Sequence, residues 1–127
     1  MTAKRLKSIR TSALHFQSGG CFYRGLPMWL AAPSELGLRP RNARAFQCTA
    51  EHLVAQQDGG LDTPENIVAA CIFCNQRRHK RRGPAPAPEL FRAHVQRRLS
   101  RGKWHGALRV SRPQGQGTFG AEEICVS

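Results

Sequence analysis

Acidic residues are scarce in this chain: 8 Asp and Glu stand against 20 Lys and Arg, which gives a formal net charge of +12. A charge of that size exceeds what solubility needs and favours a polyanionic partner. The chain also lacks any apolar run near the roughly 18 residues of a membrane-spanning helix, so we expect no membrane segment. Residues 4–7 read Lys-Arg-Leu-Lys, without the apolar core of a signal peptide. These absences predict a cytoplasmic protein.

Apolar side chains are also few. Hydrophobic residues make up 40% of the 127 residues, and there are six Phe, two Trp and one Tyr. The chain is long enough for one domain at most. Modules below roughly 70–80 residues usually need a staple such as a metal ion or disulfides. Five cysteines, an odd number without an export signal, indicate reduced thiols and therefore a metal as the expected staple.

The basic residues are concentrated in one part of the chain. Residues 77–112 hold twelve Lys or Arg and a single acid, Glu89. The densest part is predicted to contact nucleic acid through Arg77, Arg78, Lys80, Arg81 and Arg82. Such contacts go to phosphates, so we expect salt-dependent binding of double-stranded DNA with weak sequence specificity. A solvated basic face without a partner is the alternative.

Residues 51–75 combine several chemically informative features. Glu51 and His52 open a short apolar run, and a Gly59-Gly60 pair indicates a loop. A second apolar run over 67–70 leads into a pair of cysteines and a basic segment. The pattern predicts strand, loop, strand and helix, with an acid, a histidine and an amide converging near one metal ion.

This run resembles the HNH endonuclease motif, a ββα-metal nuclease module. The residues that carry the resemblance are Glu51, His52, Gly59, Gly60, Asn66, Cys71, Cys74 and Asn75, with a looser match at Cys21. It implies an α+β fold: a small ββα-metal (HNH) module with a degenerate zinc knuckle and flanking helices.

The resemblance also implies a role for each motif residue. His52 is similar to the general base that deprotonates the attacking water, and Asn66 to the amide that orients the loop and the base. Glu51 and Asn75 resemble the metal ligands. Two oxygen ligands favour Mg²⁺ or Mn²⁺. The implied activity is hydrolysis of DNA phosphodiester bonds.

Other interpretations of the motif stay open. The chain could be a catalytically weak or inactive HNH relative that acts as a basic DNA-binding module. It could also be an RNA- or ribosome-associated zinc-ribbon protein, although that class needs no Glu51-His52 and Asn75 set. His52 could be a core histidine, and Cys71 and Cys74 could be small buried thiols.

A possible structural zinc site is incomplete. Residues 21–29 resemble the first zinc knuckle of cysteine-bearing HNH proteins, but Arg24 replaces the second cysteine. Structural zinc sites are four-coordinate, and Arg24 cannot serve as a ligand. Three thiolates remain, at Cys21, Cys71 and Cys74, with Cys48 as the first candidate for the fourth ligand and His79 as another, although His79 is expected to face solvent or DNA. We expect the Arg24 side chain to point outward, toward DNA.

The flanking segments complete the predicted organisation. Residues 1–16 form a basic N-terminal segment with apolar residues at helical spacing. Residues 17–112 are expected to form the HNH domain, in which a Gly- and Pro-rich stretch over 83–88 ends the motif helix. A C-terminal helix is predicted over 89–101. Residues 113–127, rich in glycine, are expected to be disordered.

Overall fold

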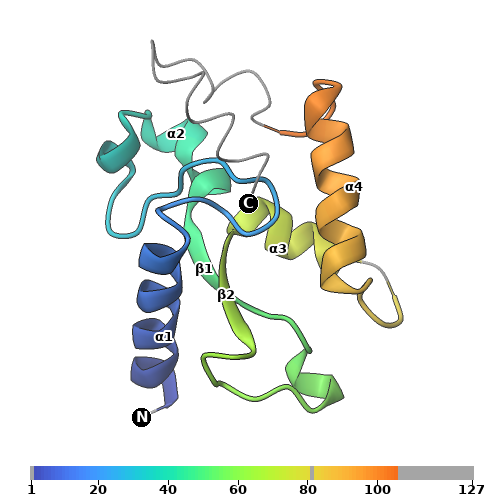
Figure 1. The fold of residues 1–127 in the computed structure, drawn as a ribbon. Coiled ribbons are helices and arrows are strands. Elements are labelled where there is room, and N and C mark those ends of the chain that lie inside the picture. The colour runs from blue at the N-terminus through green and yellow to red at the C-terminus, as the bar shows by residue number, and fades with distance from the viewer. Residues whose placement is uncertain (1, 81, 106–127) are drawn as a thin grey trace.

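The computed structural model describes residues 2–80 and 82–105. The structure is α+β, with helices around a two-stranded antiparallel sheet (Figure 1). In chain order the elements are α1 (Thr2–Phe16), the 3₁₀ turn η1 (Pro33–Leu36), α2 (Pro40–Ala43), the 3₁₀ turn η2 (Arg44–Phe46), β1 (Cys48–His52), the 3₁₀ turn η3 (Gln56–Asp58), β2 (Ile67–Cys71), α3 (Ile72–Arg78) and α4 (Pro88–Ser100).

The predicted order of strand, loop, strand and helix is confirmed by β1, β2 and α3. Cys48 pairs with Cys71 at one end of the sheet, and His52 pairs with Ile67 at the other. Because side chains alternate along a strand, Glu51 and His52 point to opposite faces of the sheet. The side chains of the last two residues of β1 therefore contact different residues, one set on each face of the sheet.

The helix expected in the N-terminal segment is present as α1, which packs on both strands. Leu14 lies in the same buried cluster as Cys48 and Ala69 of the sheet. Just after α1, the Gln17 side chain bonds to the outer edge of β2: its Nε2 donates to the Ala69 carbonyl at 2.8 Å, and its Oε1 accepts the Ala69 N–H at 3.0 Å. These contacts fix the end of α1 to the sheet.

The motif helix is shorter than the sequence predicts. The Gly- and Pro-rich stretch at 83–88 is its expected end, but α3 ends at Arg78, with His79 as its C-cap. Part of the basic run therefore lies beyond the helix and not around its distal half. The C-terminal helix is confirmed as α4, which has Pro88 in its first turn, where a missing N–H costs nothing.

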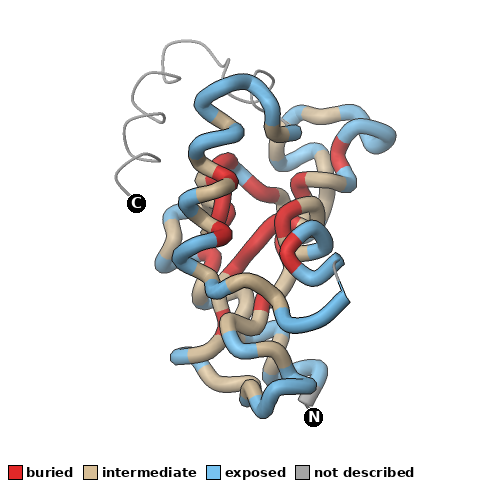
Figure 2. Tube along the Cα trace, turned by 90° about the vertical axis from the view of Figure 1, so that its right-hand side faces the viewer, coloured by how far each residue is buried: buried red, intermediate tan, exposed pale blue. Residues whose placement is uncertain are grey.

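Figure 2 shows the buried residues gathered between the sheet and the surrounding helices. Tyr23, Phe91 and Val95 extend this core from the sheet to α4. The Tyr23 and Phe91 rings meet edge to face with centroids 5.0 Å apart, a favourable aromatic geometry. Trp104 packs against the same cluster, as expected of a residue that closes the core.

The predicted tail over 113–127, with Cys125, lies outside the described residues, as does Arg81. Within the described part of the chain, none of the helices is both long and apolar enough to cross a membrane.

Candidate functional site

Glu51 is the most deeply buried acid of the motif, with only 1% of its surface exposed. It points toward α3. Its Oε2 accepts hydrogen bonds from the Tyr23 hydroxyl at 2.8 Å and from Nη1 of Arg78, the last residue of α3, at 2.7 Å. Oε1 faces His79, whose Nε2 lies 3.0 Å away. Burial and the Glu51 carboxylate raise the pKa of Tyr23. One carboxylate oxygen is thus committed to the core, and the other faces the surface side of α3.

Arg78 corrects one prediction about DNA contacts. It is only 3% exposed, and its guanidinium donates to the carbonyls of His52, Leu53 and Pro86 as well as to Glu51. A buried charge requires a paired, hydrogen-bonded environment, and Glu51 supplies it. Arg78 therefore fixes the end of β1 and does not reach a nucleic acid.

His79 is a neighbour of Glu51 that the sequence reasoning did not place there. The sequence offers it as a zinc ligand or as a surface residue facing solvent or DNA. Its side chain is 32% exposed, yet its imidazole meets the Glu51 carboxylate. The available signal is its spacing from Asn75, since residues four apart share one face of a helix.

Asn75 lies on this same face of α3, half-buried against β1. Its Nδ2 donates to Thr49 Oγ1 at 3.1 Å and to the Ala50 carbonyl at 3.3 Å. These bonds fix the plane of the amide and use its nitrogen. Asn75 and Glu51 are thus both held between α3 and β1, where the sequence predicts two metal ligands.

His52 lies on the other face of the sheet. Its Nε2 is 2.7 Å from Asp62 Oδ1, and both side chains are largely shielded from solvent, with exposed fractions of 15% and 21%. The hydrogen bond with His52 holds the pKa of Asp62 below its ordinary value. Asp62 lies just after the Gly59-Gly60 pair in the sequence, and its partnership with His52 depends on how that loop folds back.

Asn66 organises that loop through its side-chain amide. Oδ1 accepts the Val54 N–H at 2.8 Å, while Nδ2 donates to the carbonyls of Val54 at 3.1 Å and Leu61 at 3.0 Å. Gly60 completes the turn, since a Cβ there would lie 1.7 Å from the Val54 carbonyl oxygen. Asn66 and Gly60 together fix the path that brings Asp62 to His52.

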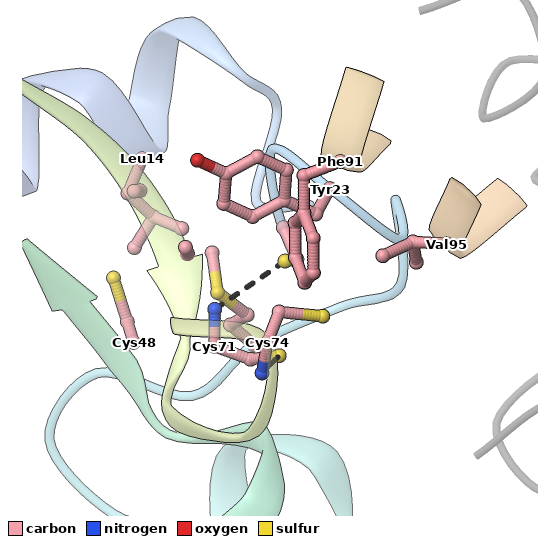
Figure 3. Close-up of a cluster of buried hydrophobic side chains, with 11 residues drawn as sticks. Leu14, Tyr23, Cys48, Cys71, Cys74, Phe91 and Val95 are labelled. Carbon is pink, nitrogen blue, oxygen red and sulfur yellow. Dashed lines mark hydrogen bonds between the residues drawn. The ribbon is translucent and has the colours of Figure 1, made fainter. Parts of the chain in front are cut away.

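Three of the predicted zinc ligands come together. The sulfur atoms of Cys21, Cys71 and Cys74 lie within 4.8 Å of one another, and all three residues are buried. Cys71 and Cys74 face the core beside Val95 and Phe91 in Figure 3. Thiolates are suitable zinc ligands, so the donor chemistry fits zinc at three positions.

No fourth Cys, His, Asp or Glu joins these cysteines among residues 2–80 and 82–105. Cys48 is buried at the start of β1, but its sulfur is not within the group. Burial raises the pKa of Cys48 to about 11. The indole N–H of Trp104 donates to Cys74 Sγ at 3.4 Å.

Hydrogen bonds shift the pKa values of the three thiols in different directions. Burial raises the pKa of Cys71 to about 12 and also raises that of Cys74. Burial acts the same way on Cys21, but the bonds it accepts from both other thiols and from the backbone N–H of Arg24 and Cys71 outweigh it, so the pKa of Cys21 is lowered. Cys21 is therefore the sulfur that the cluster prepares best to carry charge.

The expectation that Arg24 points outward is wrong. Arg24 is fully buried, and it donates to the carbonyls of His105 at 2.6 Å and Ala45 at 2.8 Å. Its guanidinium also lies over the Phe46 ring, 4.4 Å from the centroid, and 5.5 Å from that of Phe73. Two carbonyls and two aromatic faces hold the cation inside, so Arg24 takes the place of a knuckle cysteine as an internal crosslink.

The other predicted nucleic-acid contacts differ from Arg78. Arg77, Lys80 and Arg82 are exposed at the end of α3 and beyond it. Arg77 lies over the Phe73 ring at 4.6 Å from the centroid, which orients it while leaving it accessible. These three cations stand on the α3 side of the sheet.

Comparison with known proteins relates the centre of the chain to one family. Residues 41–81 match the family model described as HNH endonuclease. No curated protein and no solved structure matches the chain. The matched range contains β1, the Asn66 loop, β2 and α3.

Proposed function

We propose that the chain is an HNH endonuclease, on the premise of the match of residues 41–81 to that family, and that it hydrolyses phosphodiester bonds of double-stranded DNA with His52 as the general base. HNH domains point to nucleic-acid substrates, and the net charge of +12 suits a polyanion. The observation that carries the proposal is the 2.7 Å pair between His52 and Asp62.

The Asp62 pair gives His52 a defined orientation. A carboxylate 2.7 Å from Nε2 favours the imidazole tautomer that carries a proton there, which leaves Nδ1 free to accept a proton from water. Asn66 supports this arrangement indirectly, because it holds the loop that presents Asp62. His52 is then the catalytic residue, and Asp62 and Asn66 position it.

We propose that Glu51, Asn75 and His79 hold the catalytic divalent ion. Glu51 Oε2 is anchored by Tyr23 and Arg78, whereas the partner of Oε1 is His79, the proposed co-ligand, and Asn75 supplies an amide oxygen. Mg²⁺ or Mn²⁺ suits the two oxygen donors. When bound, such an ion stabilises the charge that develops on the phosphate and the leaving oxygen.

We further propose a structural zinc ion at Cys21, Cys71 and Cys74, with a fourth ligand that is not a Cys, His, Asp or Glu side chain of residues 2–80 and 82–105. The separation of 4.8 Å or less among the sulfurs and the indole N–H on Cys74 support it. With three thiolates the complex carries one net negative charge, and the adjacent buried Arg24 supplies the matching positive charge.

A second candidate function is DNA binding without efficient cleavage. The observation that favours it is the division of the motif between two faces: Glu51 packs against α3, whereas His52 packs against the loop. Both carboxylate oxygens of Glu51 also have protein partners already.

The deciding experiment is plasmid nicking by the full chain in Mg²⁺, in Mn²⁺ and in EDTA. His52→Ala should lower the cleavage rate by about 10²–10⁴-fold, the usual contribution of general-base catalysis, while duplex affinity in EDTA stays at the wild-type value. Asp62→Asn should lower kcat by a smaller factor and leave KM unchanged.

His15→Ala is the matched control, because His15 is exposed on α1 and has no part in the mechanism. Wild-type nicking by His52→Ala would refute the assignment of the base. A wild-type protein that binds the plasmid but never nicks it would support the second candidate function, DNA binding without efficient cleavage.

A further inference from the structure

We propose that the exposed side of α1, formed by Lys4, Arg5 and Lys7, is a second phosphate-binding surface for duplex DNA. This inference rests on the proposed function, and it adds a binding surface outside the matched range of 41–81. It places cations on the His52 side of the sheet, whereas Arg77 belongs to α3, beside Glu51.

The charge of α1 is of one sign. Its fifteen residues contain no Asp or Glu, and Lys4, Arg5 and Lys7 are all exposed. None of the three takes part in a salt bridge within the described residues. Uncompensated, solvent-exposed cations are the groups that release counterions when they meet phosphates.

Contacts of Arg5 place this surface beside the proposed general base. Arg5 Nε donates to the Asp62 backbone carbonyl at 3.3 Å, and the Asp62 carboxylate in turn meets His52. Arg5 therefore contacts the residue that pairs with His52, although Arg5 and His52 are far apart in the sequence. Figure 1 shows the N-terminal end of α1 near the loop that joins β1 to β2.

The two basic groups lie on different sides of the sheet. Arg77, Lys80 and Arg82 belong to the α3 side, together with Glu51, whereas α1 packs on the strands beside His52. A DNA backbone that passes the end of β1 would meet cations on both sides of the sheet. These cations would hold one phosphodiester bond between the proposed metal ligands and the general base.

A lipid surface fits α1 less well. Along most of α1 the large apolar residues are covered: Leu14 is buried, and Leu6 and Ile9 are half-buried. Phe16, at the C-terminal end and away from Lys4, Arg5 and Lys7 in the sequence, is the one large apolar side chain of α1 that is exposed. A helix that lies on a membrane needs an apolar face toward the lipid. The outward side of α1 around Lys4 and Ser8 is polar instead, which suits phosphates reached through water.

The test compares two triple variants of the full chain, each with three positive charges removed. Lys4→Ala/Arg5→Ala/Lys7→Ala alters the proposed surface. Arg39→Ala/Arg41→Ala/Arg44→Ala is the matched control, since these arginines are exposed near the opposite end of β1. Affinity for a short fluorescent duplex is measured in EDTA over a range of salt, so that no cleavage enters the result.

The α1 variant should flatten the slope of log K against log salt by about 0.9 for each phosphate that is no longer neutralised, hence by roughly 2–3. The control variant should keep the wild-type slope to within about 0.5. Equal slopes for the α1 variant and wild type would overturn this inference while the proposed nuclease function stands on its nicking assay.

A second variant separates DNA binding from loop support. Lys4→Ala/Lys7→Ala leaves the Arg5 contact with Asp62 intact, and it should still flatten the slope by roughly 1–2. If only the triple variant had an effect, together with a lower melting temperature, α1 would support the loop and the inference would be wrong. A wild-type protein without duplex affinity would overturn both proposals.

Discussion

Replacing the buried Arg24 is the most informative stability experiment on this protein. Arg24→Met removes two hydrogen bonds from a charged donor to backbone carbonyls, at about 1.5–3 kcal/mol each. It also removes a buried cation–π contact of about 2 kcal/mol. The variant no longer has to desolvate a guanidinium, a cost of several kcal/mol, so these unfavourable changes are partly offset. We expect a net destabilisation of about 2–3 kcal/mol on these terms.

Arg24→Lys should be worse than Arg24→Met. Lysine keeps a positive charge in the same interior, but its ammonium cannot reproduce the planar fork that reaches the carbonyls of both Ala45 and His105. The desolvation cost remains while the compensating hydrogen bonds do not form. A destabilisation of about 3–5 kcal/mol is expected, the usual cost of a buried charge that has lost its compensating partner.

Urea denaturation of the chelator-treated protein, followed by tryptophan fluorescence, measures these differences. Trp104 adjoins His105 and reports on the region that Arg24 holds. The urea midpoint should be highest for wild type, lower for Arg24→Met and lowest for Arg24→Lys. The slope m of the free energy of unfolding against urea concentration should stay the same. If Arg24→Lys were more stable than Arg24→Met, the charge would matter more than the hydrogen-bond geometry, and the reasoning would be refuted.

Two further predictions concern the motif. Glu51→Gln should lower the free energy of unfolding by about 3–5 kcal/mol, because it leaves the buried Arg78 without its counter-charge. Glu65→Gln, on the exposed loop, is the control and should change the free energy of unfolding by less than about 0.5 kcal/mol. Equal urea midpoints for the two variants would contradict this prediction. Cys71→Ser should abolish the binding of one equivalent of zinc, and Cys48→Ser should keep it; metal analysis after gel filtration decides, and zinc loss in Cys48→Ser would make Cys48 the fourth ligand.

The local order of elements is predictable because local signals determine it. The Gly59-Gly60 pair and the two apolar runs indicate a hairpin, and Pro88 with the apolar spacing after it indicates α4. These signals need no knowledge of distant neighbours. The position at which α3 ends is not predictable in this way, because nothing in the basic run after Cys74 distinguishes a helical residue from one beyond the C-cap.

The sequence misleads where a charged side chain is buried by tertiary contacts. Arg78 belongs to a run of cations that looks uniformly exposed, and only the position of β1 beneath α3 selects it for burial. Arg24 is expected at the surface because it cannot bind zinc, yet two carbonyls and two aromatic rings, distant in sequence, create an internal site for it. Asp62 likewise becomes the partner of His52 only after the loop has folded.

The amide of Gln17 has a consequence for how the protein behaves at high concentration. A two-stranded sheet has free edges on both sides, and an exposed edge is a template for pairing with another chain. By bonding to both the N–H and the carbonyl of Ala69, Gln17 occupies the outer edge of β2 as a neighbouring strand would. The Phe22 N–H also donates to the Ala69 carbonyl, at 2.9 Å, so this side chain and one backbone group together shield the middle of β2 from the addition of a strand of another molecule.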